Sequence, residues 1–241
     1  MAEANRESKR GTTLNRDTGR GTGTYAKGMK RRELLLDAAA DLLREQTLDE
    51  ISLKNIAEYA GIPIGSAYHF FGNAQALYTE LANRFMLQLS VSIAQPYSGS
   101  STESWRALFD TAVERAASLY AKHPAYRQLI IGGKAPPEIK LADRSHDERI
   151  GELMIAIISR HFEFPDFPQS RDVFFYATEI VDLMFSLSVM RNSKITPDMI
   201  AEAKKAAGAY LSQYLPDALP KKVSVATVKD RYPGSVSSGA E

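Results

Sequence analysis

The sequence predicts an all-α protein with an N-terminal three-helix helix-turn-helix domain followed by a larger helical domain. Apolar residues recur at spacings of three and four through most of residues 34–214, the period of an amphipathic helix. No segment alternates apolar and polar residues convincingly as a strand does. With 241 residues, 44% of them hydrophobic, the chain is long enough to bury a core without disulfides, and it has no cysteine.

The first elements are short and separated by recognisable caps and turns. The stripe from Leu34 to Leu43 predicts a first helix, and Ser52 is placed to cap a second one. Gly61 interrupts the pattern, and Pro63 can open a third helix at its first position. Asn73 then predicts the start of a fourth helix, over residues 74–93. Two short helices joined by a glycine turn are the parts of a helix-turn-helix.

The second half contains longer stripes that predict further helices. They cover residues 105–120, a short segment at 125–131, and residues 150–158, 173–190 and 197–214. The stretch at 173–190 is apolar nearly all round, so we expect it to be buried on several sides.

Composition divides the chain into four parts. Residues 1–28 mix Gly, Thr and Arg and predict a flexible basic arm, while residues 217–241 predict a loose tail. Between them we expect the helix-turn-helix domain at 29–73 and the larger helical domain at 74–216.

The net charge of +1 conceals an uneven distribution. Residues 1–32 hold nine basic and three acidic side chains, a charge of +6, whereas residues 33–72 hold two basic and seven acidic ones, a charge of −5. A basic arm of this kind indicates contact with a polyanion, although a solvated tail without function has the same composition.

Residues 30–85 resemble, in order and spacing, the DNA-binding domain of the TetR family. The resemblance rests on the Leu34–Leu43 stripe, Ser52 to Ala57, Ala60-Gly61-Ile62, Gly65 to Phe71, and Asn73 with Leu77. It implies a homodimeric transcriptional regulator, usually a repressor that a small-molecule ligand releases from a palindromic operator in double-stranded DNA. The ending from Ile195 to Leu215 is loosely similar to the regulatory domain of the family, so the resemblance makes residues 29–73 the DNA-binding domain and residues 74–216 a helical regulatory domain for ligand binding and dimerisation.

The resemblance also implies which residues contact DNA. Ile64, Gly65 and Ser66 fall where the family faces base edges, and Tyr68 and His69 fall where it contacts phosphates. Adding the arm, the preceding helix and the caps gives the predicted DNA-binding set: Lys27, Lys30, Arg31, Arg32, Ser52, Lys54, Pro63, Ile64, Gly65, Ser66, Tyr68, His69 and Asn73. Packing beneath the hairpin is the alternative for Tyr68, and a surface position without a role is the alternative for His69.

Three departures from the family pattern, two at single positions and one in helix composition, all remove phosphate contacts. Ala74 stands where the family commonly has lysine, and Phe70 where it usually has histidine. The recognition helix itself contains no Lys or Arg. Because phosphate contacts supply much of the affinity for DNA, we expect the basic arm to provide the missing charge.

The effector site is predicted from aromatic, Met and acidic residues of the second half, with plain core packing as the alternative for the apolar ones. The predicted ligand contacts are Trp105, Tyr126, Phe174, Phe175, Glu179, Asp182 and Met184. Glu179, Asp182 and Ser186 form a polar line on an apolar helix, and buried carboxylates need partners. This line predicts either ligand binding or pairing across a dimer seam, which the family forms through its last two helices.

Other classes of protein are not indicated. The sequence has no P-loop, no G-x-S-x-G elbow and no H-E-x-x-H motif, and its four histidines lack ligand spacing, so we expect no enzyme, cofactor or metal site. No secretory signal and no run of 18 apolar residues is present, which predicts a cytoplasmic protein without a membrane partner. The alternative function is a ligand-independent helical regulator that binds DNA or another protein.

Overall fold

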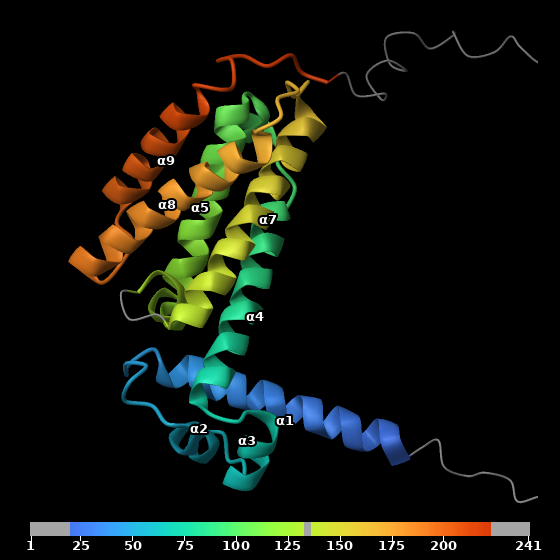
Figure 1. The fold of residues 1–241 in the computed structure, drawn as a ribbon, viewed down its shortest axis with the longest axis vertical. Coiled ribbons are helices and arrows are strands. Elements are labelled where there is room, and N and C mark those ends of the chain that lie inside the picture. Colours follow the sequence, from blue (N-terminus) through green and yellow to red (C-terminus); the bar gives the residue numbers. More distant parts are fainter. Residues whose placement is uncertain (1–19, 133–135, 223–241) are drawn as a thin grey trace, which may run out of the picture.

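The computed structural model describes residues 20–132 and 136–222. Within these ranges the regular structure is helical apart from one isolated antiparallel bridge between Phe162 and Lys221, so the all-α prediction is confirmed. A small three-helix head lies at one end of the molecule and a larger bundle at the other, with one long helix running from the head into the bundle (Figure 1).

The head consists of α1 (Arg20–Leu42), α2 (Leu53–Tyr59) and α3 (Ile64–Phe70). Ser52 caps α2, as predicted, by accepting a hydrogen bond from the Asn55 backbone N–H. Pro63 is the N-cap of α3 rather than its first helical residue. Gly61 has a φ of +65°, a conformation that suits glycine, and the turn lets the Ile62 N–H donate to the Ala57 carbonyl at 2.9 Å.

The fourth helix, α4 (Ala74–Ala94), belongs to both parts of the molecule. Asn73 caps it as predicted, since its Oδ1 accepts from the Ala76 N–H at 2.8 Å. Leu77 and Leu81 are fully buried near the head, and Phe85 is fully buried one turn further along. One continuous apolar core therefore runs from the head into the bundle.

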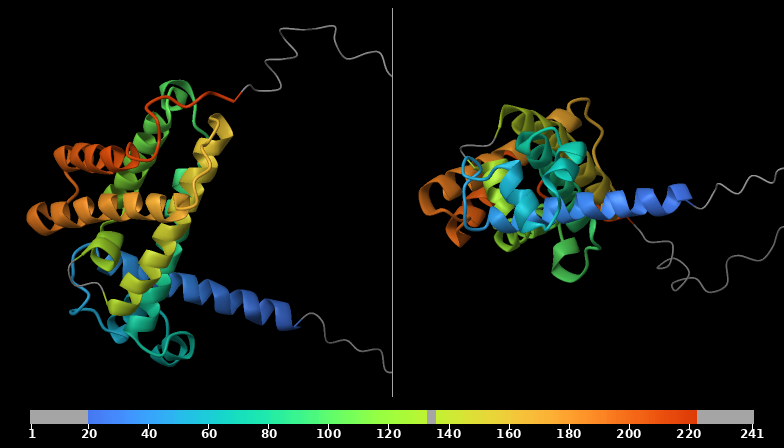
Figure 2. Two further views of the ribbon diagram at one scale, coloured as in Figure 1. Left: turned by 45° about the horizontal axis from the view of Figure 1, so that its top comes forward. Right: turned by 90° about the horizontal axis from the view of Figure 1, so that it is seen from below.

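The larger part is a bundle in which α8 packs between α7 and α9 (Figure 2). Its elements are a 3₁₀ turn η1 (Gly99–Thr102), α5 (Trp105–Lys122), a short α6 (Pro124–Tyr126), a π-helical turn η2 (Arg127–Ile131), α7 (Pro137–His161), α8 (Ser170–Asn192) and α9 (Pro197–Leu211). Thr196 caps α9 as its position before Pro197 suggests.

The expectation that residues up to 28 are flexible is wrong for residues 20–28, which form the first turns of α1. Three glycines lower the helix propensity of this stretch, but the helix continues through Tyr25, Ala26 and Lys27 into the well-packed part of α1. Residues 1–19 of the predicted arm lie outside the described residues.

The C-terminal tail is also shorter than predicted, because residues 217–222 pack against the end of α7. Leu219 is buried, the Glu163 N–H donates to the Pro220 carbonyl at 2.8 Å, and the Lys222 N–H donates to the His161 carbonyl at 2.9 Å. The rest of the predicted tail, residues 223–241, lies outside the described residues.

Helix α7 begins at Pro137, well before the apolar stripe that predicted it at 150–158. The buried positions of its first half include Asp143, His146 and Asp147. An apolar stripe is absent there because the helix turns polar side chains toward the interior, which hides the usual amphipathic signal.

The prediction that the helix at 173–190 is buried on several sides is wrong for a single chain. Tyr176, Leu183 and Met190 are exposed along one face of α8. Among the described helices, α8 alone is long and apolar enough to cross a membrane. Its packing between α7 and α9 is that of a bundle helix, which passes the same test of length and composition.

Helices α7 and α8 approach closely at Gly151, which allows a matched test of the packing. An added Cβ at Gly151 would lie 2.9 Å from the Phe175 backbone nitrogen, whereas one at Gly65 would meet nothing within 4 Å. Gly151→Ala should therefore lower the free energy of unfolding by about 1–3 kcal/mol. Gly65→Ala should raise it by about 0.5–1 kcal/mol, because alanine favours a helix. Urea unfolding measures both, and equal stability of the two variants would contradict this packing.

Candidate nucleic-acid interface and interior cavity

The exposed face of α3 is the first candidate site. Ile64, Gly65, Tyr68 and His69 are exposed, while Ala67 is fully buried and anchors the helix against the head. These four residues share one face of the helix because they are spaced at one, three and four positions. Tyr68 keeps 54% of its surface exposed, so it does not pack beneath the hairpin. This face can donate and accept hydrogen bonds and offers an apolar side chain, as reading of base edges requires.

Two of the predicted DNA contacts also act as helix caps. The Ser52 hydroxyl accepts from the Asn55 N–H at 3.2 Å, and Asn73 caps α4. Lys54 remains exposed and lies 3.8 Å from Glu58 one turn along α2, in a solvated pair. Ser66 is partly buried, and Pro63 is exposed at the start of α3.

The basic residues of α1 divide into two groups. Arg32 pairs with Glu80 of α4 and lies over the Phe71 ring, with its guanidinium carbon 5.4 Å from the ring centroid. This residue ties α1 to α4 while 32% of its side chain stays exposed, and its contact with DNA stays a prediction. Lys27, Lys30 and Arg31, in contrast, are exposed, and their spacing of three and four places them on one face of the helix.

The exposed basic face lies beside the end of α3. A Cβ built on Gly28 would lie 3.8 Å from the Phe70 ring, so α1 passes close to the last residue of α3. The N-terminal half of α1 also projects sideways beyond the head (Figures 1 and 2). Where the family usually has a histidine that contacts phosphate, Phe70 makes a packing contact with α1. The same stretch of α1 carries the three exposed cations.

The bundle contains an interior cavity of about 50 Å³ between α4, α5, α7 and α8. Apolar and aromatic side chains form most of its wall, and Asp147, Thr178 and Asp182 are the polar exceptions besides the Tyr120 hydroxyl. The wall consists of Leu89, Ile93, Phe109, Ala112, Val113, Ala116, Tyr120, Asp147, Ile150, Met154, Thr178, Val181, Asp182 and Phe185.

A second, more polar cavity of about 170 Å³ adjoins the first, since Asp182 lines both. Its charged residues are Lys140, Asp143 and Arg144 of α7 and Glu179 of α8. Arg144 donates to Glu179 at 3.2 Å, which leaves Asp143 and Asp182 without a paired cation among the described residues. The predicted polar line of Glu179, Asp182 and Ser186 therefore faces α7 within one chain, as the ligand-binding alternative requires.

Burial and mutual repulsion disfavour ionisation of these carboxyl groups. Burial first, and then the charges of Asp182 and Glu179, raise the pKa of Asp143 to about 8. The pKa of Asp182 is raised to about 7 by burial and by Glu179, and that of Asp147 is raised well above its usual range by burial and then by Asp182, Asp143 and Glu179. Burial and the three aspartates also raise the pKa of the Tyr120 hydroxyl. The cluster holds protons near neutral pH unless a positive charge joins it.

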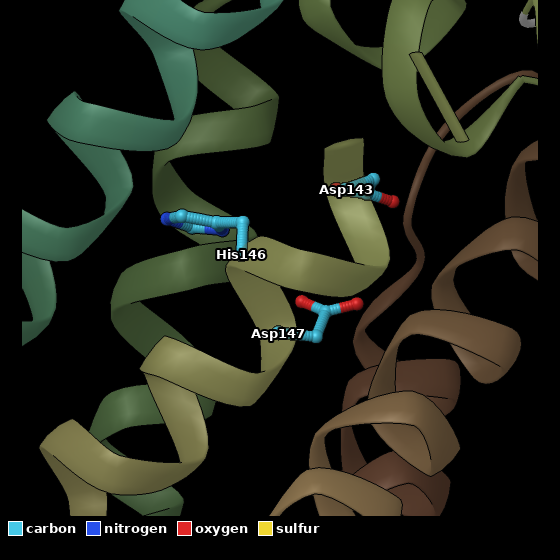
Figure 3. A group of neighbouring side chains, drawn as sticks. All are labelled: Asp143, His146 and Asp147. Carbon is cyan, nitrogen blue, oxygen red and sulfur yellow. The ribbon is translucent and has the colours of Figure 1, made fainter. Parts of the chain in front are cut away.

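Asp143, His146 and Asp147 offer ligand atoms within 4.8 Å of one another, a spacing that a metal ion could use. The His146 ring points toward α4, away from the two carboxylates, and its Nε2 lies 3.0 Å from the Ser90 hydroxyl (Figure 3). Burial lowers the pKa of His146 to about 4, and its Nδ1 has no hydrogen-bond partner among the described residues. The two aspartates instead approach α8, so the three groups diverge and fit a metal ion poorly.

Most of the other predicted ligand contacts lie outside these cavities. The Trp105 indole donates to the Pro216 carbonyl at 2.8 Å, Tyr126 stacks on Phe85 with centroids 4.1 Å apart, and Phe174 packs against Phe164. Phe175 and Met184 are partly buried without lining either cavity. Large aromatic side chains did not predict the ligand site, because these residues pack in the core instead of lining a cavity.

Sequence reasoning missed Asp143, Asp147 and Tyr120. A carboxylate pair one turn apart is common on exposed helix faces, and only the contact of α7 with α8 shows that this pair is buried. The sequence signal that could have found this pair is the missing apolar stripe in the first half of α7, a helix that packs in the core.

Comparisons with known proteins agree with this geometry. Residues 35–81 match the family model of bacterial regulatory proteins of the tetR family, and residues 103–215 match that of the tetracyclin repressor-like C-terminal domain. A comparison with curated protein sequences gives no match. These matched domains are those of regulators and not of enzymes.

Solved structures share the fold over most of the chain. A TetR-family transcriptional regulator from Streptomyces coelicolor is 28% identical, with a TM-score of 0.60, over 77% of this chain and 99% of its own. Regulators from Rhodococcus sp. RHA1 (18% identical, TM-score 0.56, covering 78% and 99%) and Syntrophomonas wolfei (15%, 0.61, covering 78% and 98%) also match.

The buried carboxyl of Asp182 makes stability depend on pH. Its pKa is about 7 in the fold and about 3.9 in an unfolded chain. The folded state therefore binds the proton more tightly, and stability present at low pH is lost as the pH rises from about 4 to about 7.

Asp182→Asn removes this proton linkage. Its stability relative to the original chain should rise over that pH window and then level off, as thermal unfolding at pH 4 to 8.5 would show. Glu148→Gln, on the exposed face of α7, is the matched control and should give no such trend. A difference for Asp182→Asn that stays constant from pH 4 to pH 8 would contradict the buried cluster.

Proposed function

Because the chain belongs to the TetR family of bacterial regulatory proteins, we propose that it is a homodimeric repressor released from a palindromic operator by a small molecule. The observation that carries the proposal is the exposed face of α3, held out by the Gly61 turn in a head that matches the family. A DNA-binding regulator of this kind works in the cytoplasm, where we place the protein.

In the proposed complex, α3 enters the major groove. Ile64 meets a thymine methyl group, Ser66 a base edge, and Tyr68 and His69 the phosphates. Lys54 and the N-termini of α2 and α4 add contacts to the backbone, because helix N-termini favour anions. Lys27, Lys30 and Arg31 supply the positive charge that the acidic head lacks.

The apolar stripe on the outer face of α8 supports a dimer. Tyr176, Ile180, Leu183, Leu187 and Met190 follow one another at spacings of four and three, the pattern of a helix seam. Ile180 and Leu187 are half-buried, and the other three side chains are exposed. Pairing of this stripe with that of a second copy, flanked by α9, buries the surface that a single chain exposes. The two α3 helices then read half-sites about 34–36 Å apart, one turn of DNA.

Release of DNA follows from the position of α4. Leu89 and Ile93 line the interior cavity, whereas Leu77 and Leu81 pack in the head on the same helix. A ligand that spreads the cavity wall displaces α4 and with it the head. The equilibrium then favours a dimer whose α3 helices are too far apart for the operator.

The role of the basic face of α1 can be tested with a charge-matched control. Changing Lys27, Lys30 and Arg31 together to Gln should weaken operator binding and reduce the slope of log affinity against log salt by about two to three. Changing Arg160, Lys221 and Lys222 to Gln alters the net charge equally at the far end of α7. Anisotropy titrations at several salt concentrations should leave this control close to the original chain, and equal slopes for all three proteins would contradict the assignment.

Selection of bound sequences from random double-stranded DNA tests the function itself. The full chain should enrich a palindrome with half-sites one helical turn apart. Leu183→Glu, placed on the α8 stripe, should yield monomers by light scattering and no palindrome, while Leu141→Glu on α7 should behave as the original chain, because Leu141 is exposed outside that stripe. Absence of any enriched sequence would overturn the proposal and favour an interaction protein that does not bind DNA.

A further inference from the structure

The chemical class of the effector is indicated by one side chain above all. Asp147 is only 6% exposed and lines the apolar cavity. It forms no hydrogen bond or ion pair with any residue in the described part of the chain. A buried carboxyl group without a partner is unfavourable, so its place at the cavity wall needs a ligand that satisfies it.

The surroundings contain several acidic groups and few basic ones. Asp143 and Asp182 lie close enough to Asp147 to raise its pKa, and the nearby cation, Arg144, is already paired with Glu179. Lys140 lines the outer cavity but is exposed. Within the described residues the cluster therefore has more acidic groups than basic ones, and a cation entering the cavity would balance the excess.

The remaining wall decides what kind of cation fits. Phe109, Tyr120 and Phe185 present aromatic rings, and the other lining residues are mostly aliphatic. Ring faces attract organic cations, and aliphatic walls favour a hydrocarbon tail. A hydrated metal ion would lose its water to an apolar wall without gaining enough oxygen ligands. An anion would find no free cation to pair with in this cluster, because Arg144 is already paired with Glu179.

We propose that the cavity binds a small organic ammonium ion, with its N–H groups donating to Asp147 and Asp182 and its short hydrocarbon part against Phe109, Val113 and Phe185. This inference rests on the proposed function in that the ammonium ion is the effector. The outer polar cavity, which shares Asp182, is the route by which the charged group reaches the site.

Binding of the cation also moves protons. The carboxyl groups of Asp143, Asp147 and Asp182 hold protons in the free protein because burial raises their pKa values. The other groups that face them are Arg144 and Glu179, the exposed Lys140 at the outer cavity, and the Tyr120 hydroxyl from α5; His146 lies on the opposite side of α7. An ammonium ion favours the carboxylate form, so its binding releases protons to the solvent.

Three probes with the same carbon chain and different charge provide the test. Calorimetric titration of the full chain with n-butylammonium, 1-butanol and butyrate, in buffers of different ionisation enthalpy, measures affinity and proton release together. The ammonium ion should bind at least about tenfold more tightly than the alcohol or the acid. Its binding should release protons. Equal binding of the alcohol, or tighter binding of butyrate, would overturn the proposal.

Variants locate the site. Asp147→Asn should weaken n-butylammonium binding by about tenfold or more and reduce proton release. Asp182→Asn provides a second variant should the first fail to fold, and circular dichroism checks both. Glu148→Gln, exposed on the same helix, should bind as the original chain does. Unchanged binding in both aspartate variants, or saturation by Mg²⁺ or Zn²⁺ in place of the amine, would overturn the assignment.

The two proposals fail in different ways. A chain that selects a palindrome but does not bind n-butylammonium remains a regulator, and the ammonium class is then wrong. If the chain binds n-butylammonium through Asp147 but selects no DNA, the ammonium site is supported and the proposed function as a repressor is overturned. Palindromic binding that n-butylammonium does not weaken would overturn its role as effector.

Discussion

The structure depends on α4 being shared by two parts of the protein. Arg84 on this helix pairs with Asp37 of α1 at 2.7 Å and with Glu33 at 3.2 Å, while Arg32 of α1 pairs with Glu80. The next residue along α4 is Phe85, which stacks on Tyr126 and contacts Tyr120 in the bundle. Since close-packed interiors transmit displacement, these contacts give the proposed coupling between the cavity and the head a physical basis.

A second connection reinforces the first at the junction. The Gln128 amide in η2 donates to the carbonyls of Leu43 and Gln46, at 2.7 and 2.9 Å, and so ties the end of α1 to the bundle. The neighbouring residues Leu129 to Ile131 are buried, and Ile130 and Ile131 also line the outer cavity. A change at the acidic cluster can therefore reach the head through η2 as well as through α4, and both routes end on α1.

Features set by forces within a few residues could be predicted from the sequence, whereas features set by contacts between helices could not. Ser52, Asn73 and Gly61 act through hydrogen bonds and φ angles within a few residues, so their roles were predictable and are confirmed. The apolar stripes likewise predicted the order of the helices. The first half of α7 escaped prediction because Asp143 and Asp147 occupy its buried side. Of the predicted cavity contacts, Asp182 and Glu179 do line the cavities, whereas Trp105 and Phe174 fill the core elsewhere.

The uneven charge of the chain has a structural counterpart. The acidic block coincides with the head, and some of its charge is already used: Glu33 and Asp37 pair with Arg84. The basic residues Lys27, Lys30 and Arg31 are exposed on the segment of α1 whose Gly28 lies close to Phe70 at the end of α3. In the proposed function, affinity for DNA and its release therefore involve the same helix, because the exposed cations of α1 come directly before the residues that anchor it to α4, Arg32, Glu33 and Asp37.

The distance between the two heads of the dimer tests this account most directly. The chain has no cysteine, so a single Glu45→Cys substitution at an exposed position just after α1 gives one spin label per subunit. Pulsed electron–electron double resonance measures the distance between the two spin labels of the dimer. It should show one narrow distance with operator DNA and a longer distance with saturating n-butylammonium. A single distribution, shared by the free, DNA-bound and ammonium-saturated protein, would contradict the coupling of cavity and head through α4.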